Sequence, residues 1–207
     1  FGGPVHDSWL TERADLGRKN QRIMRTLGME PVLQAFSGMV PVDIATHDPN
    51  AEIIPQGVWC SFRRPTMLKT NTATYDKYAR DFYEAQREVF GDAKYYATDP
   101  FHEGGNTGGM STTVVASALL DSLLDFDSDA VWVIQSWQGN PSTGLLAGLR
   151  QGTDRRDHAI VLDLYAEKDQ NWKTYGEDTD GDGLKEFSDT PWVFCQLNNF
   201  GGRMGLH

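Results

Sequence analysis

The sequence of 207 residues lacks several features that would point to particular classes of protein. It has 19 Lys and Arg against 29 Asp and Glu, so it lacks the surplus of positive charge with which proteins bind nucleic-acid phosphates. It also lacks any run of about 20 apolar residues, the length that a helix needs to cross a bilayer. We therefore expect no nucleic-acid partner and no membrane insertion of this segment.

Cysteine is scarce as well. Cys60 and Cys195 allow either one disulfide or two buried thiols, because both stand among apolar and aromatic residues. The sequence has no Asn-X-Ser/Thr glycosylation signal, and its first residues lack the charged and apolar regions of a signal peptide. We expect the parent protein to continue on both sides of this chain.

What the sequence does contain is a repeated alternation of apolar, β-prone runs with segments of helical period. Five runs have strand character and end in polar residues; they span residues 30–36, 93–98, 130–135, 159–165 and 192–197. Residues 9–27, 75–90 and 112–124 place apolar side chains three and four positions apart, as amphipathic helices do. This order predicts an α/β fold with a parallel sheet that helices cover on both faces.

Polar and aromatic residues follow the predicted strands: Glu103, Trp137, Glu167 and Asn199. In a parallel βα array the carboxyl ends of the strands converge on one mouth, which is where such folds place their sites. Indole rings beside carboxylates and amides suit a sugar, whose apolar face stacks while its hydroxyls form hydrogen bonds. This chemistry favours a carbohydrate enzyme, although Trp137 and Trp59 also suit a purely packing role.

Glu103 is the strongest catalytic candidate. Pro100 stops the run 93–98, because proline has no N–H for a strand ladder, and leaves Glu103 just beyond the strand tip. A carboxylate held beside the imidazole of His102 and the ring of Phe101 suits a general acid. The alternative is a loop glutamate that caps the following segment.

Seven sequence blocks occur in a fixed order along the chain. They contain Gly2-Gly3-Pro4, Leu27-Gly28-Met29, Ala35-Phe36-Ser37-Gly38, Asp99-Pro100-Phe101-His102-Glu103, Asp129-Ala130-Val131-Trp132, Asp163-Leu164-Tyr165-Ala166-Glu167 and Asn199-Phe200-Gly201-Gly202. In this order the chain resembles the family 89 glycoside hydrolases, the α-N-acetylglucosaminidases. The resemblance implies a (β/α)8 TIM-like barrel of which this chain, as part of one catalytic domain, covers about five βα units. It also implies retaining, exo-acting removal of terminal α-linked N-acetylglucosamine from mucin-type or heparan-type glycans.

The resemblance assigns Glu103 the role of general acid/base, which protonates the leaving oxygen and then activates water. The family's nucleophile is a glutamate in a Pro-Glu-Gly context beyond the Asn-Phe-Gly-Gly block, and no such motif occurs before His207. We therefore expect the nucleophile to lie outside this chain. Two alternatives stay open: a glycosidase that pairs Glu103 with Glu167, for which a carboxyl spacing near 5 to 5.5 Å is diagnostic of retention, and a sugar-binding segment without turnover.

The resemblance also implies the wall of a subsite for one N-acetylglucosamine. The matching positions are Trp59, His102, Trp137, Leu164, Glu167, Asn199 and Phe200. Three departures stand out: the family usually has Asn where His102 stands, His where Asn198 stands, and a Met-Pro type of continuation where this chain has Gly104-Gly105. We hypothesise that His102 replaces the usual amide as a hydrogen-bond partner of the sugar.

An insertion at residues 176–190 stands outside the family pattern. It places oxygen ligands at positions 1, 3, 5, 7, 9 and 12 of a twelve-residue loop with glycine at position 6, as calcium loops do. The expected ligands are Asp178, Asp180, Asp182, the carbonyl of Leu184, Glu186 and Asp189. The alternative is a solvated acidic loop. We expect a structural Ca²⁺, no cofactor for catalysis, and an extracellular or cell-surface bacterial protein, or a lysosomal one if the source is animal.

Overall fold

A five-stranded parallel sheet forms the centre of the molecule in the computed structural model, which describes residues 5–151, 155–167, 170–175 and 190–195. The strand order is β1-β7-β8-β9-β10, and every neighbouring pair is parallel. The strands are β1 (Val32–Gln34), β7 (Tyr95–Ala97), β8 (Val131–Ser136), β9 (Ala159–Asp163) and β10 (Trp192–Phe194). Each lies within one residue of a predicted run, so the expected parallel α/β arrangement is confirmed.

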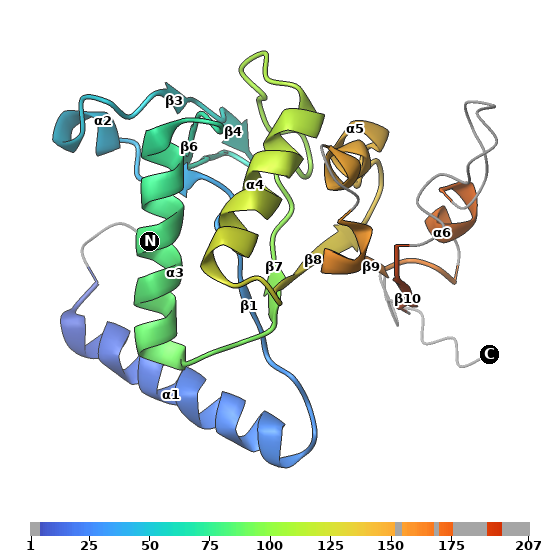
Figure 1. Ribbon diagram of the computed structural model, residues 1–207. Coiled ribbons are helices and arrows are strands. Elements are labelled where there is room, and N and C mark those ends of the chain that lie inside the picture. Colours follow the sequence, from blue (N-terminus) through green and yellow to red (C-terminus); the bar gives the residue numbers. More distant parts are fainter. Residues whose placement is uncertain (1–4, 152–154, 168–169, 176–189, 196–207) are drawn as a thin grey trace.

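Three long helices connect and cover this sheet, as the apolar spacing predicts. They are α1 (Asp7–Thr26), α3 (Ala73–Phe90) and α4 (Thr112–Phe126). The hydroxyl of Thr72 caps α3 by accepting a hydrogen bond from the N–H of Tyr75, and Gly91, with a φ of 78°, ends it. Figure 1 shows α3 and α4 side by side on one face of the sheet, with α1 across the end of α3. The shorter helical segments are α2 (Ile44–His47), α5 (Thr143–Ala147), η1 (Gly148–Arg150), η2 (Arg156–His158) and α6 (Asn171–Thr174).

Aromatic side chains hold α3 and α4 against the sheet. Tyr83 on α3 stacks on Phe126 of α4 with ring centroids 5.1 Å apart. The Tyr83 hydroxyl accepts a hydrogen bond from the N–H of Phe36, and the Tyr75 hydroxyl donates one to the carbonyl of the same residue. Trp132 on β8 is fully buried, and its indole N–H donates to the carbonyl of Thr98. These bonds fix the ends of β1 and β7, from which the following loops start.

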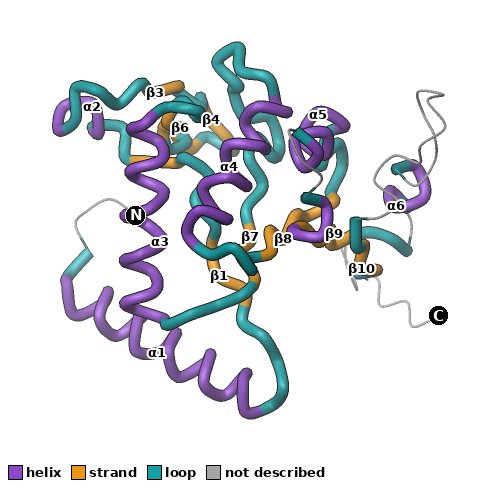
Figure 2. The backbone as a smooth tube through the Cα atoms, viewed as in Figure 1, coloured by secondary structure: helices purple, strands orange, loops and turns teal. Residues whose placement is uncertain are grey.

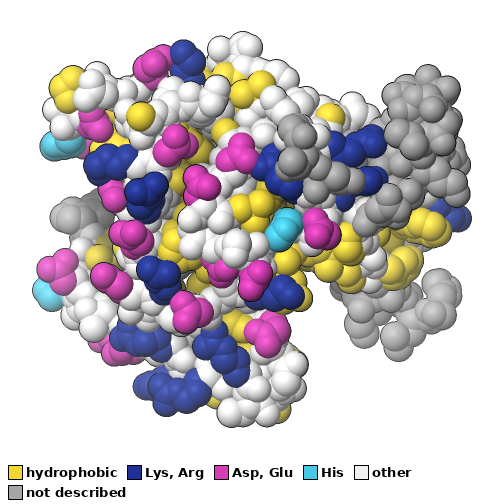
Figure 3. Space-filling model, in the orientation of Figure 1, with side chains coloured by type: hydrophobic (Ala, Val, Ile, Leu, Met, Phe, Trp, Pro, Cys, Tyr) yellow, Lys and Arg dark blue, Asp and Glu magenta, His cyan; other side chains and the backbone are white. Residues whose placement is uncertain are grey.

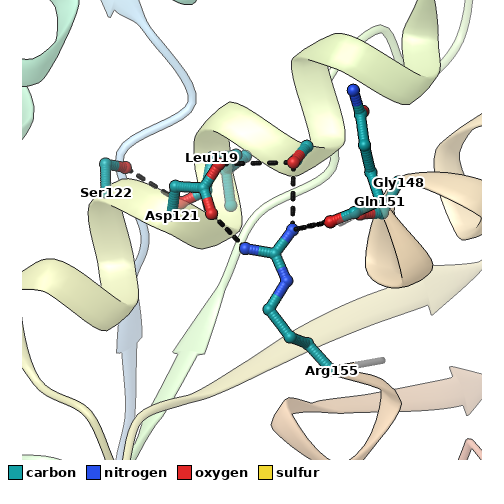
Figure 4. Close-up of polar contacts among 7 residues, drawn as sticks. Leu119, Asp121, Ser122, Gly148, Gln151 and Arg155 are labelled. Carbon is teal, nitrogen blue, oxygen red and sulfur yellow. Dashed lines mark hydrogen bonds and ion pairs between the residues drawn. The ribbon is translucent and has the colours of Figure 1, made fainter. Parts of the chain in front are cut away.

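Arg155 ties α4 to the segment that follows α5, as Figure 4 shows. Its guanidinium forms an ion pair with Asp121 and donates hydrogen bonds to the hydroxyl of Ser117 at 2.9 Å and the carbonyl of Gly148 at 3.3 Å. Gly148 is required here because a Cβ atom would lie 2.6 Å from the Cβ of Ala116 on α4. The close approach seats α5 and η1 on α4, below the loops that follow β8.

Residues 39–68 form a small antiparallel region that the sequence pattern did not predict. It contains a three-stranded sheet of β2 (Met39–Val40), β6 (Thr66–Leu68) and β3 (Ile53–Ile54), and a hairpin of β4 (Val58–Trp59) and β5 (Phe62–Arg63). The hairpin turns through Cys60 and Ser61, which have φ angles of 47° and 68°, the geometry of a type I′ turn. The expectation of one disulfide or two buried thiols is therefore wrong, because Cys60 is an exposed, free thiol at this turn and Cys195 is also free.

The surface has mixed charge. Figure 3 shows Asp and Glu side chains interspersed with Lys and Arg over the face that contains α1 and α3. No helix within the described ranges has the length and apolar character that crossing a membrane requires.

Candidate active site

A cleft of about 290 Å³ lies at the carboxyl ends of β7 and β8. One wall comes from the loop after β7 and contains His102 and Glu103, and the facing wall comes from the turn after β8 and contains Trp137. The remaining lining residues are Pro100, Phe101, Gly104, Thr112, Gln138, Gly139, Asn140, Ser142 and Leu145. Figure 2 shows the long loop that leaves β7, rises beside hairpin β4–β5 and returns to α4. The structure thus brings three predicted site residues together at the expected end of the sheet.

The turn that presents Glu103 has an unusual backbone. Phe101 and Glu103 have φ angles of 62° and 54°, in the left-handed region that side chains other than glycine rarely adopt. Gly105 closes the turn through a hydrogen bond from its N–H to the carbonyl of Phe101, and a Cβ atom at Gly105 would lie 2.8 Å from the Phe101 Cα. A side chain at Gly105 would therefore clash with the backbone of this turn.

The flanks of hairpin β4–β5 brace this loop. The side chain of Gln56, before the hairpin, donates to the carbonyl of Asn106 at 2.8 Å and accepts from its N–H at 3.0 Å. The guanidinium of Arg64, after the hairpin, donates to the carbonyls of His102 at 3.4 Å and Glu103 at 2.6 Å. Trp59 lies on the hairpin itself with 49% of its surface exposed, outside the cleft that the described residues form.

Asp99, which the sequence analysis left out of the site, joins the two walls of the cleft. Its carboxylate Oδ1 accepts hydrogen bonds from the N–H of Gln135 at 2.8 Å and from the side-chain amide of Asn140 at 3.0 Å. Asn140 in turn exchanges two backbone hydrogen bonds with Trp137. Burial raises the pKa of Asp99 to about 6, although these hydrogen bonds and the neighbouring His102 oppose the rise. The sequence did contain a signal for Asp99, because it is an acidic residue at the end of a predicted strand, close to His102 and Glu103.

His102 has a ring nitrogen, Nε2, that is buried and has no hydrogen-bond partner among the described residues. A buried polar atom without a partner costs free energy unless a ligand or water satisfies it. The ring also lines the cleft that contains Glu103. The arrangement is therefore suited to a hydrogen bond with a polar group of a bound molecule.

Trp137 links the cleft to the next strand tip. It is half-buried, and its ring packs against that of Tyr165, just after β9, with centroids 5.8 Å apart. Leu164 lies at the same tip and donates its N–H to the carbonyl of Ser136 at 3.2 Å. Glu167 is exposed. Neither Leu164 nor Glu167 lines the cleft that holds Glu103.

Several predicted residues lie outside the described part of the chain. These are the pocket candidates Asn199 and Phe200 and the calcium candidates Asp178, Asp180, Asp182, Leu184, Glu186 and Asp189. Within the described ranges, no three His, Cys, Asp or Glu residues cluster so that they could hold a metal ion.

Comparisons with known proteins agree on one family. A sequence model of the α-N-acetylglucosaminidase TIM-barrel domain matches residues 1–207. Human α-N-acetylglucosaminidase is 28% identical over 216 residues, which cover all of this chain and 28% of the human protein. A family 89 glycoside hydrolase from Clostridium perfringens, solved with 2-acetamido-1,2-dideoxynojirimycin, is 45% identical with a TM-score of 0.86 over all of this chain and 22% of that protein.

A second structure of the Clostridium perfringens protein holds its substrate, GlcNAc-α-1,4-galactose. It is 44% identical to this chain with a TM-score of 0.86, over the same shares of the two chains, and two of its glutamates are changed to glutamine. The chain therefore spans about a quarter of the length of the relatives that it matches. The five parallel strands and their helices form part of a TIM barrel, as the sequence predicts.

Proposed function

We infer that this chain, which belongs to the α-N-acetylglucosaminidase TIM-barrel family, supplies the general acid/base side of a glycosidase active site. The complete protein would hydrolyse terminal α-linked N-acetylglucosamine. The observation that supports this most directly is the cleft at the carboxyl ends of β7 and β8, where Glu103 shares a surface with His102 and Trp137. A carboxyl group at the mouth of a parallel barrel is in the place where such folds hold their catalytic residues, and it can supply the acid/base half of the carboxyl pair that glycoside hydrolysis uses.

In the proposed mechanism Glu103 acts twice. In the first step its carboxyl group gives a proton to the glycosidic oxygen while the bond from that oxygen to the sugar C1 breaks and a carboxylate nucleophile bonds to C1. In the second step the Glu103 carboxylate takes a proton from water, which attacks C1 and releases the nucleophile. Two displacements return the sugar in its original α configuration, so the reaction is retaining.

We propose that the nucleophile lies outside this chain. The Clostridium perfringens protein whose structure holds its substrate has two substituted glutamates more than one hundred residues apart. If Glu103 is one of the equivalent pair, no glutamate of this chain lies that far from it, because the last is Glu186 and the first is Glu12. Glu167, the rival partner, does not line the cleft that contains Glu103. Both observations argue against Glu167 as the nucleophile, and from the family resemblance we propose that it has a structural or pocket-orienting role.

The remaining pocket assignments follow the same reasoning. We propose that Trp137 packs against the apolar face of the sugar and that the buried Nε2 of His102 forms a hydrogen bond with one of its polar groups. From the family resemblance alone, we also propose that four further residues contribute to the sugar subsite: Trp59, Leu164, Asn199 and Phe200. The substrate of the Clostridium perfringens relative makes GlcNAc-α-1,4-galactose the first glycan to test.

Two further proposals concern the protein outside the cleft. We propose that residues 178–189 bind a structural Ca²⁺, because alternate acidic residues and a glycine at the sixth position match a calcium loop. We also propose an extracellular or cell-surface location in a bacterium, which the calcium-type insertion and the missing glycosylation signal favour.

Hydrolysis of p-nitrophenyl α-N-acetylglucosaminide by the complete protein tests the proposed function. We expect turnover that Glu103→Ala abolishes. Absence of turnover from the folded complete protein would overturn the assignment and favour another glycosidase or a sugar-binding role. Turnover that Glu103→Ala leaves unchanged would keep the activity but remove Glu103 from it.

A further inference from the structure

Arg64 is the residue of the antiparallel region that contacts the Glu103 turn most closely. It follows β5, is half-buried, and donates hydrogen bonds from both terminal nitrogens to consecutive carbonyls, those of His102 and Glu103. The bond to Glu103, at 2.6 Å, is short for an N–H donor. No acidic side chain of the described residues forms an ion pair with Arg64. The hydrogen bonds of its guanidinium go to the backbone carbonyls of this turn.

The backbone of the Glu103 turn has a conformation that external hydrogen bonds must stabilise. Its residue Glu103 has a φ of 54°, a conformation that persists only where surrounding contacts hold it. A guanidinium presents its donors in a planar fork, so bonds to the carbonyls of His102 and Glu103 hold the two peptide groups on either side of the Glu103 Cα. The orientation of these two peptide groups sets the direction in which the Glu103 side chain leaves the backbone. Misplacement of a catalytic group by about 1 Å costs roughly a hundredfold in rate.

We propose that Arg64 is a positioning residue that holds Glu103 in the orientation required to protonate the leaving oxygen. This inference rests on the proposed function of Glu103. Arg64 acts through the backbone, because it bonds to the two carbonyls and does not line the cleft. The neighbouring Arg63 on β5 is exposed and is the matched control, because it has the same charge and lies one position away on the same hairpin.

The test compares two substrates in the complete enzyme: p-nitrophenyl α-N-acetylglucosaminide and GlcNAc-α-1,4-galactose. The galactose hydroxyl is a much poorer leaving group than p-nitrophenol, so its departure depends more strongly on protonation by Glu103. We expect Arg64→Ala to lower kcat/KM for the disaccharide at least about tenfold more than for the aryl glycoside. Arg64→Lys, which keeps the charge but loses the fork, should show a smaller change in the same ratio, and Arg63→Ala none.

The ratio of the two kcat/KM values keeps the test decisive when a variant is partly unfolded, because a smaller active fraction lowers both values equally. Equal losses on the two substrates in Arg64→Ala, or in Arg64→Lys where the alanine variant does not fold, would overturn the inference. If the unsubstituted complete enzyme hydrolyses neither substrate, the proposed function itself has failed. A ratio change in Arg63→Ala as large as that in Arg64→Ala would also contradict a specific role for Arg64.

Discussion

The carboxylate of Asp99 at the tip of β7 accepts a hydrogen bond from the backbone N–H of Gln135 on β8, at 2.8 Å. Its second bond, from the side chain of Asn140, reaches the turn that carries Trp137. The peptide of Asp99 also contributes to the other wall, because its carbonyl accepts a hydrogen bond from the N–H of His102 at 3.4 Å. One residue thus connects the two walls between which a sugar would bind.

Asp99 should give the protein a recognisable dependence of stability on pH. Its pKa is raised from 3.8 to about 6, so the folded state binds the proton more tightly than the unfolded state. Its contribution to stability is therefore greatest below about pH 4 and is lost as the pH rises through about 6. We expect the free energy of unfolding of the complete protein, relative to Asp99→Asn, to fall by an amount on the order of 3 kcal/mol from pH 4 to pH 7.

Denaturant titrations of both proteins at several pH values measure this difference. The comparison with Asp99→Asn is needed because carboxylates in ordinary ion pairs make the free energy of unfolding rise with pH. Their contribution is the same in both proteins, so it cancels in the difference. Asp129→Asn, at an exposed position after α4, is the matched control for the removal of one carboxylate. A stability difference between wild type and Asp99→Asn that does not vary with pH would contradict the raised pKa.

Trp137 should contribute to substrate binding. We expect Trp137→Ala to raise KM for p-nitrophenyl α-N-acetylglucosaminide about tenfold, because one lost stacking contact of about 1.4 kcal/mol corresponds to that factor. Trp172 is an exposed tryptophan outside the cleft, so Trp172→Ala should leave KM within about twofold. Steady-state kinetics on the complete protein measure both. Partial unfolding lowers kcat without changing KM, so an unchanged KM in Trp137→Ala would contradict the proposed stacking contact.

Glu167 separates the proposed mechanism from its nearest rival. Because Glu167 does not line the cleft of Glu103, we expect Glu167→Ala to lower kcat less than about tenfold. A nucleophile would behave differently, since its removal stops the first displacement and abolishes turnover. Loss of all activity in a folded Glu167→Ala protein would therefore favour a Glu103 and Glu167 pair.

Chelation tests the proposed calcium loop. We expect EDTA to lower the melting temperature of the complete protein by several degrees and added Ca²⁺, but not Mg²⁺, to restore it, because the loop pattern offers more oxygen ligands than Mg²⁺ uses. Asp180→Asn should weaken the response by removing one charged ligand. A melting temperature that EDTA leaves unchanged would count against the site.

The sequence predicted the parallel strands and long helices because their apolar periodicity extends over enough residues to be distinctive. Hairpin β4–β5 was missed because its strands have two residues each, too few for a period, and its turn lacks the usual Asn-Gly signal. Glu103 was found through its place at a strand tip. Asp99 and Arg64 were not, because their importance arises from partners 36 and 39 residues away that only the fold brings near.

The most direct test of the account is azide rescue of Glu103→Ala in the complete protein. With p-nitrophenyl α-N-acetylglucosaminide, whose leaving group needs little protonation, a retaining enzyme without its acid/base still forms the glycosyl-enzyme intermediate. Azide needs no general base, so it should restore turnover and yield the α-configured N-acetylglucosaminyl azide. Formation of the β-azide would identify Glu103 as the nucleophile instead, and a Glu103→Ala protein as active as wild type without azide would contradict the central claim.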